Sequence, residues 1–206
     1  MKCIHHTDAD GLCAAAIVYR ELNNIYQPAK PSDFIPYNYG WKLELPGDVK
    51  AGETIYIVDL SLDDVIMNAI EFFVAHGCDV VHIDHHISTQ KYYSELSDDR
   101  KKIYDEDVIK FFSDKISGCM LTWIYACMNV DERSHPQTVV YDFAERYTHV
   151  CLWIDTPNAR EISIPLSVRL IDDNDVWRHS YEESKYFAIA FKSITKEHKI
   201  PTNNNM

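Results

Sequence analysis

Two apolar runs in this chain stop abruptly at acidic and histidine residues. The run at 80–83 is followed by Asp84-His85-His86, and the β-branched run at 54–58 is followed by Asp59. Short apolar runs of this kind are typical of strands that are buried on both faces of a parallel sheet. In such sheets ligands bind beyond the carboxyl ends of the strands. The pattern therefore predicts an α/β fold with a polar site at the carboxyl end of its sheet.

Alternating strands and helices are expected through the first half of the chain. The alanine-rich segment at 10–22 predicts a helix that packs closely on a sheet, and Ser61 can cap a second helix that Gly77 closes. The expected strands lie at residues 2–5, 33–37, 54–58 and 78–83, with 33–37 at an edge of the sheet because it contains Pro36. This alternation predicts a mostly parallel sheet flanked by helices.

The second half is expected to be richer in helices. Residues 91–113 are charged and are interpreted as irregular, with one short strand at 102–104. Apolar residues then become frequent, and helices are expected at 117–128, 136–154, 164–171 and 182–194. These elements define one domain over residues 1–195, followed by a polar tail or interdomain linker at 196–206.

Composition disfavours several classes of partner. The formal charge of −12 and the lack of a basic run disfavour binding of long duplex nucleic acid, whereas a small phosphate held by cations stays compatible. Charges interrupt every apolar stretch before it is long enough to span a membrane. The six cysteines are scattered without a Cys-x-x-Cys pair, which predicts reduced core residues in a cytoplasmic protein.

Another polar cluster lies near the N-terminus. His6, Asp8 and Asp10 alternate, so they can project to one side where an extended segment leaves the sheet. Imidazole and carboxylate ligands suit Mn, Fe, Co or Zn, and the lack of thiolate in the motif argues against a structural zinc site. The alternative is an aspartate-rich turn that caps a helix, beside a surface histidine.

Asp59 can belong to either cluster or to neither. A single acid after a strand is often a loop residue or the cap of the next helix. Its place at the end of a central strand would let it reach a metal in either cluster, and a carboxylate has two oxygens that can bridge two cations. Asp59 is therefore the candidate bridging ligand of a binuclear centre.

The two histidines of Asp84-His85-His86 cannot both point the same way from an extended chain. One imidazole is expected to bind metal, while the other faces the substrate or an acid. Asp84 can fix the tautomer of an imidazole, because metal-site histidines usually donate their second N–H to a carboxylate or a carbonyl. His82, inside the strand, is expected to be a hydrogen-bonded core residue.

A last acidic group precedes a tryptophan late in the chain. Asp172, Asp173 and Asp175 lie ahead of Trp177, and the alternative to a metal site here is a helix cap or a solvated turn. Tryptophans with Leu, Ile or Val nearby are expected in the core rather than as base-stacking platforms, and these are Trp123, Trp153 and Trp177.

In their order along the chain, these motifs resemble the DHH phosphoesterase superfamily, in the branch that includes nano-RNases and cyclic-nucleotide phosphodiesterases. His6-Thr7-Asp8-Ala9-Asp10-Gly11 is similar to its first motif, Asp59 to its second and Asp84-His85-His86 to its third. Asp173-Asn174-Asp175-Val176-Trp177 is similar to the fourth motif, and residues 117–125 are similar to the helix after the third. The resemblance spans residues 2 to about 190.

The resemblance implies a Rossmann-like catalytic domain with two divalent metal ions, Mn²⁺ in the first place and Mg²⁺, Co²⁺ or Fe²⁺ as other candidates. One ion would be held by His6, Asp8 and Asp59. The other would be held by Asp10, Asp59, His85 and Asp173, with Asp172 as the rival of Asp173. His86 would contact the substrate phosphate or orient the nucleophile, and Arg178 could stabilise the added negative charge. The implied catalytic residues are His86, Asp59 and Asp84.

The implied activity is hydrolysis of phosphodiester bonds in short oligonucleotides or in (cyclic) nucleotides. Such relatives usually carry a second, glycine-rich domain that grips the substrate, and this sequence has no glycine after Gly118. We therefore expect the catalytic domain without the C-terminal substrate-binding domain. The alternatives are an inorganic pyrophosphatase or polyphosphatase of the same superfamily, a nucleic-acid-associated module without activity, and a metal-binding protein without turnover.

Overall fold

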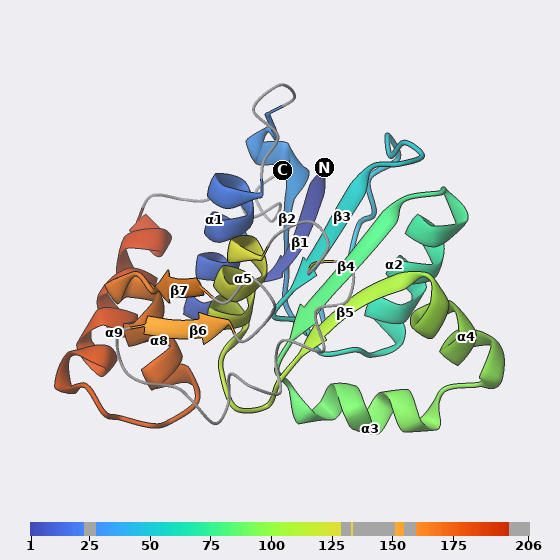
Figure 1. Cartoon of the computed structure of the whole chain (residues 1–206). Helices are drawn as coiled ribbons and strands as arrows, with labels where there is room; N and C mark the ends of the chain where they lie inside the picture. Colours follow the sequence, from blue (N-terminus) through green and yellow to red (C-terminus); the bar gives the residue numbers. More distant parts are fainter. Residues whose placement is uncertain (23–27, 129–132, 134–150, 155–159, 198–206) are drawn as a thin grey trace.

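A computed structural model of the chain describes residues 1–22, 28–128, 133, 151–154 and 160–197 (Figure 1). Its centre is a five-stranded parallel sheet with the strand order β2-β1-β3-β4-β5. The strands are β1 (Lys2–His6), β2 (Phe34–Tyr37), β3 (Thr54–Val58), β4 (Asp79–Asp84) and β5 (Val108–Phe112). The predictions of a parallel sheet and of an edge strand near residues 33–37 are confirmed.

Helices cover both faces of this sheet (Figure 1). One layer holds α1 (Ala9–Glu21), α5 (Gly118–Cys127) and α8 (Leu166–Asp175), with α9 (Glu182–Glu197) packed on α8. The other layer holds α2 (Asp64–Ala75) and α4 (Asp98–Glu106), and α3 (Ile87–Glu95) follows β4 near the carboxyl end of the sheet. The predicted α/β class is confirmed.

Successive residues of each central strand point to opposite helical layers. Tyr56 and Val58 pack in the cluster that includes α1 and α5, whereas Ile55 and Ile57 pack in the cluster that includes α2. A strand that is covered on both faces needs an apolar side chain at every position. The apolar run at 54–58 is therefore explained by its central place in the sheet.

The strand order reverses between β1 and β3. From β1 the chain crosses through α1 to β2 on one side, while β3 pairs on the other side. His5, Val58 and Ile83 lie in register near the carboxyl ends of β1, β3 and β4. Parallel sheets bind ligands at such a reversal. The residues that follow these three strands are therefore brought to one place.

The charged segment at 91–113 is more regular than its sequence suggests. The prediction of an irregular segment with a strand at 102–104 is wrong, because the segment holds the end of α3, all of α4 and β5. Tyr104 is the one buried residue of α4. A helix is recognised in a sequence by apolar residues that recur every three to four positions. With one buried residue, α4 does not show this repeat.

The predicted helix at 136–154 is wrong at its end. Residues 136–150 lie outside the described part of the chain, but strand β6 (Cys151–Ile154) is present and pairs antiparallel with β7 (Arg160–Ser163). A run of four apolar residues fits a buried helix or a strand equally well. The conformation of residues 151–154 therefore depends on pairing with β7, which the run itself does not reveal. The helices predicted at 117–128, 164–171 and 182–194 are present as α5, α8 and α9.

The start of α2 differs from the prediction. Asp63, not Ser61, caps the helix, and its Oδ1 accepts a hydrogen bond from the Ile66 N–H at 2.8 Å. The Ser61 hydroxyl is instead 2.6 Å from the Ser88 hydroxyl at the start of α3. Gly77 follows the end of the helix as predicted, in a left-handed conformation with a φ of 72°.

The tryptophans differ in their surroundings. Trp123 is partly buried against the core on the α1 and α5 side, as predicted, and its indole N–H donates to the Ser163 carbonyl at 3.1 Å. Trp177 is 80% exposed, so its prediction as a core residue is wrong. The side chain of Trp153 lies outside what the structure describes.

Other expectations concern the cysteines, the tail and the membrane. Cys3, Cys13, Cys78 and Cys119 are buried and form no disulfide, as predicted for core residues, whereas Cys127 is free but only half-buried and the side chain of Cys151 lies outside what the structure describes. Of the expected tail at 196–206, residues 196–197 end α9 and 198–206 lie outside the described ranges. Within those ranges, no helix combines the length and hydrophobicity that crossing a membrane requires.

Candidate metal centre

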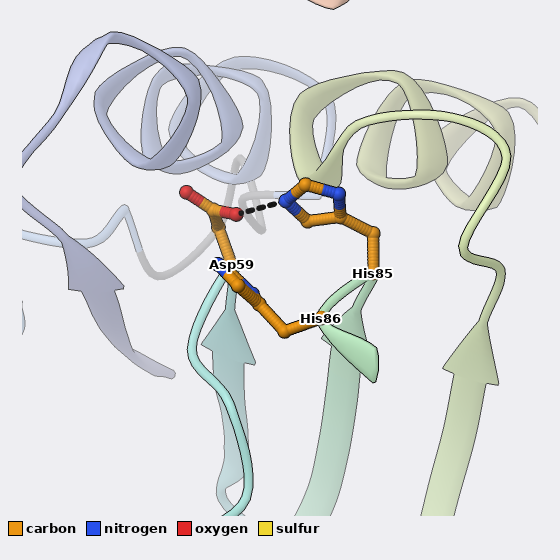
Figure 2. A group of neighbouring side chains, drawn as sticks. All are labelled: Asp59, His85 and His86. Atoms are coloured by element: carbon orange, nitrogen blue, oxygen red, sulfur yellow. Dashed lines mark ion pairs between the residues drawn. The ribbon is translucent and has the colours of Figure 1, made fainter. Parts of the chain in front are cut away.

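Three neighbouring strands deliver the polar residues of the candidate site. His6 is the last residue of β1, Asp59 follows β3, and His85 and His86 follow β4. Figure 2 shows the Asp59 carboxylate and the His85 ring turned toward each other across the ends of β3 and β4. Helices α1 and α8 contribute further carboxylates. The site therefore lies between the sheet and one helical layer.

A first group of possible metal ligands is formed by His6, Asp8 and Asp59. One ligand atom from each lies within 4.8 Å of the others, and His6 Nδ1 is 2.9 Å from Asp8 Oδ2. Asp8 also caps α1, because its Oδ1 accepts the Gly11 N–H at 2.9 Å. The helix cap and the metal ligand were alternatives for this motif in the sequence, but different oxygens of Asp8 can serve both.

A second group is formed by Asp10, His85 and Asp175, whose ligand atoms again lie within 4.8 Å of one another. The ring of His85 is central, since its Nε2 is 3.6 Å from Asp10 Oδ2, 3.5 Å from Asp175 Oδ2 and 3.2 Å from Asp59 Oδ1. A third group joins Asp59, His85 and His86. Because the groups share residues, they form one centre.

Asp59 links the first two groups through different oxygens. Its Oδ1 faces His85 Nε2 at 3.2 Å, and its Oδ2 faces His6 Nδ1 at 3.8 Å. The residue is 1% exposed, and neither oxygen has a hydrogen-bond partner among the described residues. Its backbone is left-handed, with a φ of 56°, which is strained for a residue with a side chain. A buried carboxylate that forms no hydrogen bond and faces only two imidazoles fits a cation site, because a buried charge needs close partners.

Two glycines allow the backbone to approach these ligands closely. A Cβ on Gly118, the first residue of α5, would lie 2.7 Å from Asp59 Cβ and 2.8 Å from Asp59 Oδ1. A Cβ on Gly11 would overlap the carbonyl oxygen of His6. The packing around the centre therefore requires glycine at both positions.

The N-terminus of α5 holds Asp10. The Gly118 and Cys119 N–H groups donate to its two oxygens at 2.7 and 2.8 Å. The first N–H groups of a helix and the helix dipole favour an anion at this position. Asp10 lies in the first turn of α1, at the start of the helix as predicted, and reaches His85 from there.

Carboxylates and imidazoles shift one another's pKa in this centre. Burial alone would lower the pKa of His85, but Asp59 and Asp10 raise it to about 10. Burial and the charge of Asp59 raise the pKa of Asp10 to about 7, and burial and Asp10 raise the pKa of Asp175 to about 7. Burial and the neighbouring carboxylates together disfavour the charged forms of Asp10 and Asp175, and divalent cations would favour those charged forms.

His86 is held by a separate set of hydrogen bonds. Its Nδ1 is 2.7 Å from Asp84 Oδ1, and Asp84 Oδ2 accepts the Thr89 hydroxyl at 2.5 Å. The Leu62 N–H donates to the same hydroxyl oxygen at 2.7 Å, so the single Thr89 proton is directed to Asp84. Burial would raise the pKa of Asp84, but the hydrogen bond with His86 holds it below its usual range. Asp84 is therefore a carboxylate that orients the His86 ring.

Asp173, the expected ligand from the fourth motif, serves the local backbone instead. Its oxygens accept the Ser180 N–H at 2.8 Å and the Tyr181 N–H at 3.2 Å. Asp175, two residues later, lies beside His85. The structure therefore brings Asp175, not Asp173, into the second ligand group.

Asp172, the rival candidate, is part of an ion pair. Arg178 donates to its Oδ2 at 2.5 Å, and the Ser117 N–H donates to its Oδ1 at 2.8 Å. Arg178 also donates to the Lys115 carbonyl at 2.9 Å. These contacts fasten the end of α8 to the segment before α5, and neither Asp172 nor Arg178 belongs to a ligand group of the described residues.

A helical register would have identified Asp175 from the sequence. Val168 and Ile171 of α8 are buried in the core cluster that includes α1 and α5. Asp175 follows Ile171 by four residues and Val168 by seven, so the three share one face of the helix. The local concentration of acids alone could not separate the three aspartates.

His82 is a core residue, as expected. Its ring nitrogens lie 2.7 Å from the Tyr104 hydroxyl and 2.8 Å from the Leu60 carbonyl. Burial lowers the pKa of His82, so the ring is neutral and both nitrogens are satisfied. Its role is to hold the chain that follows Asp59.

Comparison with known proteins assigns this geometry to a family. A family model described as the DHH family, N-terminal domain, matches residues 3–149. The chain belongs to the DHH family. Searches of curated proteins and of solved structures gave no match. The DHH match includes every ligand from His6 to His86, whereas Asp175 lies beyond it.

Membership in the DHH family defines the general chemistry. The DHH domain makes this chain a member of a phosphoesterase superfamily, and DHH proteins are generally hydrolases that bind divalent metals. The three ligand groups of this DHH domain are candidate positions for such ions.

Proposed function

We propose that this DHH domain is a two-metal phosphoesterase. The observation that carries the proposal is Asp59, whose two buried oxygens lack hydrogen-bond donors among the described residues and face different ligand groups. The proposed ligands are His6, Asp8 and Asp59 for one metal, and Asp10, Asp59, His85 and Asp175 for the other.

The proposed ion is Mn²⁺, since imidazole and carboxylate ligands suit it, with Mg²⁺, Co²⁺ and Fe²⁺ as other candidates. When bound, two such ions would supply an activated water and positive charge at the phosphoryl group. The protein holds the ligands in place, because Gly118 leaves space for Asp59 and the N-terminus of α5 fixes Asp10. Ligands that are already oriented need little rearrangement during the reaction.

His86 is the proposed contact to the substrate phosphate. Asp84 binds its Nδ1, which leaves Nε2 for an outside partner. Burial would lower the pKa of His86, whereas Asp84 raises it, so a protonated ring can donate from Nε2 to a phosphate oxygen. One ring nitrogen lies within 4.8 Å of ligand atoms of Asp59 and His85. Asp84 contributes to catalysis through this ring.

The proposed substrates are phosphodiesters of short oligonucleotides or of (cyclic) nucleotides. The motifs resemble the branch of the superfamily that acts on such compounds, and the net charge of −12 disfavours a general grip on long duplexes. A small substrate held largely by metal ions avoids this repulsion. We place the reaction in the cytoplasm, where unpaired cysteines persist.

A hydrolysis screen with Mn²⁺ tests the proposal. The screen covers an aryl phosphodiester, short oligoribonucleotides, cyclic mononucleotides, cyclic dinucleotides and pyrophosphate. The key variant is Asp59→Asn, because asparagine tolerates the left-handed backbone but lacks the charge. We expect turnover to fall roughly a thousandfold, since several kcal/mol of charge stabilisation would be lost.

Asp79→Asn is the matched control, because Asp79 is exposed at the opposite end of β4. This variant should retain full turnover. Unchanged turnover in Asp59→Asn would contradict the bridging role, and turnover of pyrophosphate alone would favour the pyrophosphatase alternative. Two bound metals without turnover of any substrate would favour a metal-binding protein.

A further inference from the structure

A hollow of 430 Å³ lies beside His86, and none of its other lining residues belongs to a metal-ligand group of the described residues. Its walls include Tyr39, Leu62, Lys91 and Tyr92. This volume is in the range of pockets that bind small ligands. Because His86 is the proposed phosphate contact, a group attached to that phosphate would reach the hollow.

Two tyrosines form fixed aromatic walls. The Tyr39 hydroxyl accepts the Ser61 N–H at 2.8 Å, and the Tyr92 hydroxyl donates to Asp64 Oδ1 at 2.6 Å. Both tyrosines line the hollow, and each is held by a hydrogen bond at its hydroxyl group. The Tyr39 ring also lies 5.4 Å from the ring of His6, which places this wall next to the first ligand group.

Lys91 brings a cation to the same hollow. It lies on α3, whose N-cap is His86, and its ammonium group has no ion pair or hydrogen bond within the part of the chain that the structure describes. Lys91 is exposed, so its ammonium group is available to a ligand in the hollow. A lysine in this position suits a phosphate oxygen.

We propose that the hollow binds the nucleoside unit attached to the scissile phosphate, with its base against Tyr39 and Tyr92 and its next phosphate near Lys91. Every base can stack on an aromatic ring, so the hollow would select nucleotides as a class without reading their sequence. Glu95 also lines the hollow and can accept a hydrogen bond from an amino group of the base. The inference rests on the proposed function, because it takes His86 as the phosphate contact.

Equilibrium binding to the Mn²⁺-loaded protein tests this assignment without turnover. Adenosine 5′-monophosphate and ribose 5-phosphate share a sugar and a phosphate and differ by the base. Isothermal titration calorimetry should show roughly tenfold tighter binding of the nucleotide, from the stacking of one base. Tyr92→Leu should remove most of this preference, whereas Tyr92→Phe should retain it because it keeps the ring.

Lys91→Met tests the cation separately. It should weaken binding of a non-hydrolysable phosphonate analogue of 5′-phosphorylated diadenosine roughly threefold, as expected for one exposed charge contact, and change binding of adenosine 5′-monophosphate less. Tyr186→Leu and Lys102→Met are the matched controls, since both residues are exposed and do not line the hollow. Both controls should bind every ligand as the unaltered protein does.

Equal affinity for the nucleotide and the sugar phosphate would overturn the assignment, as would a base preference that survives Tyr92→Leu. If Tyr92→Leu does not fold, Tyr39→Leu replaces it, and this variant must lose the preference for adenosine 5′-monophosphate over ribose 5-phosphate. Metal analysis of Tyr39→Leu checks that the variant still binds its Mn²⁺ ions. Failure of the proposed function gives a different result, in which base preference persists but no phosphoester is hydrolysed. Hydrolysis of phosphodiesters without any base preference would overturn the assignment of the hollow alone.

Discussion

The buried charged residues at the two ends of the sheet differ in their partners. At the amino ends, Lys2 is 5% exposed, but its ammonium contacts Asp33 at 3.3 Å and Asp48 at 3.0 Å. At the carboxyl ends, Asp59 is 1% exposed and has no hydrogen-bond donor among the described residues. Lys2 is satisfied by two carboxylates, whereas the only ion-pair partners of Asp59 among the described residues are the His85 and His6 rings, which are themselves possible metal ligands. The difference separates a structural ion pair from a site that fits cations.

The pKa shifts show the same contrast. Burial would lower the pKa of Lys2, but Asp48 and Asp33 raise it, so the ammonium keeps its charge. At the other end, burial and Asp59 raise the pKa of Asp10 to about 7, so this acid tends to lose its charge. At the amino end, the charge of Lys2 is neutralised by acids of the same chain. At the carboxyl end, bound cations would favour the charged form of Asp10.

The largest effect is expected from Asp175→Asn, which removes a carboxylate from the second ligand group. Turnover should fall roughly a thousandfold, and one of two Mn²⁺ ions should be lost. Asp173→Asn is the control, since Asp173 binds backbone N–H groups, and it should keep both ions while losing about 1.5 kcal/mol of unfolding free energy. Metal analysis, hydrolysis assays and urea titration measure these changes, and the reverse pattern would make Asp173 the ligand.

A smaller but still large effect is expected from Gly118→Ala. The added Cβ would lie 2.7 Å from Asp59 Cβ and must displace it. A shift of about 1 Å in a catalytic group can cost roughly a hundredfold in rate, so we expect a loss of that size in kcat. Gly47→Ala is the control, because a Cβ there meets nothing within 4 Å. Equal activity of the two variants would show that the close packing on Asp59 is unimportant.

Thr89→Val should lower kcat roughly tenfold, as is usual when a residue that orients a catalytic group is lost. The change keeps the shape of the side chain but removes the hydroxyl that donates to Asp84. Thr89→Ser should restore activity, because it restores the donor. Thr89→Val and Thr89→Ser with the same kcat would mean that this hydrogen bond does not position His86.

The smallest effect on activity is expected at the amino end of the sheet. Lys2→Met removes the paired cation and should cost about 1 kcal/mol in the free energy of unfolding, with kcat unchanged. Thermal unfolding and hydrolysis assays measure the two quantities separately. A fall in kcat without a fall in the free energy of unfolding would contradict a purely structural role for Lys2.

Much of the fold and most of the candidate ligands could be predicted, because each follows from a local pattern. The apolar runs at 54–58 and 80–83 are central strands, and polar residues come directly after them. Parallel strands align their carboxyl ends, so Asp59 and His85 had to lie near each other. No knowledge of distant residues was needed for this step.

The features that could not be predicted depend on distant partners. Asp175 has a local signal in its register with Val168 and Ile171, but only the packing of α8 on α1 and α5 shows that this face points to His85. Tyr104 is the one buried residue of α4, and its hydroxyl lies 2.7 Å from a ring nitrogen of His82. Strand β6 is defined by its pairing with β7, which the sequence of four apolar residues does not specify.

The hydrogen bond from the Gly118 N–H to Asp10 joins positions that are 108 residues apart in the chain. Closing so long a loop carries an entropy cost, and the centre is complete only when β1, α5 and α8 have met. Ions that bind only this assembled arrangement would stabilise the native state of nearly the whole chain. The supply of divalent metal would then affect the stability of the folded protein as well as its reactivity.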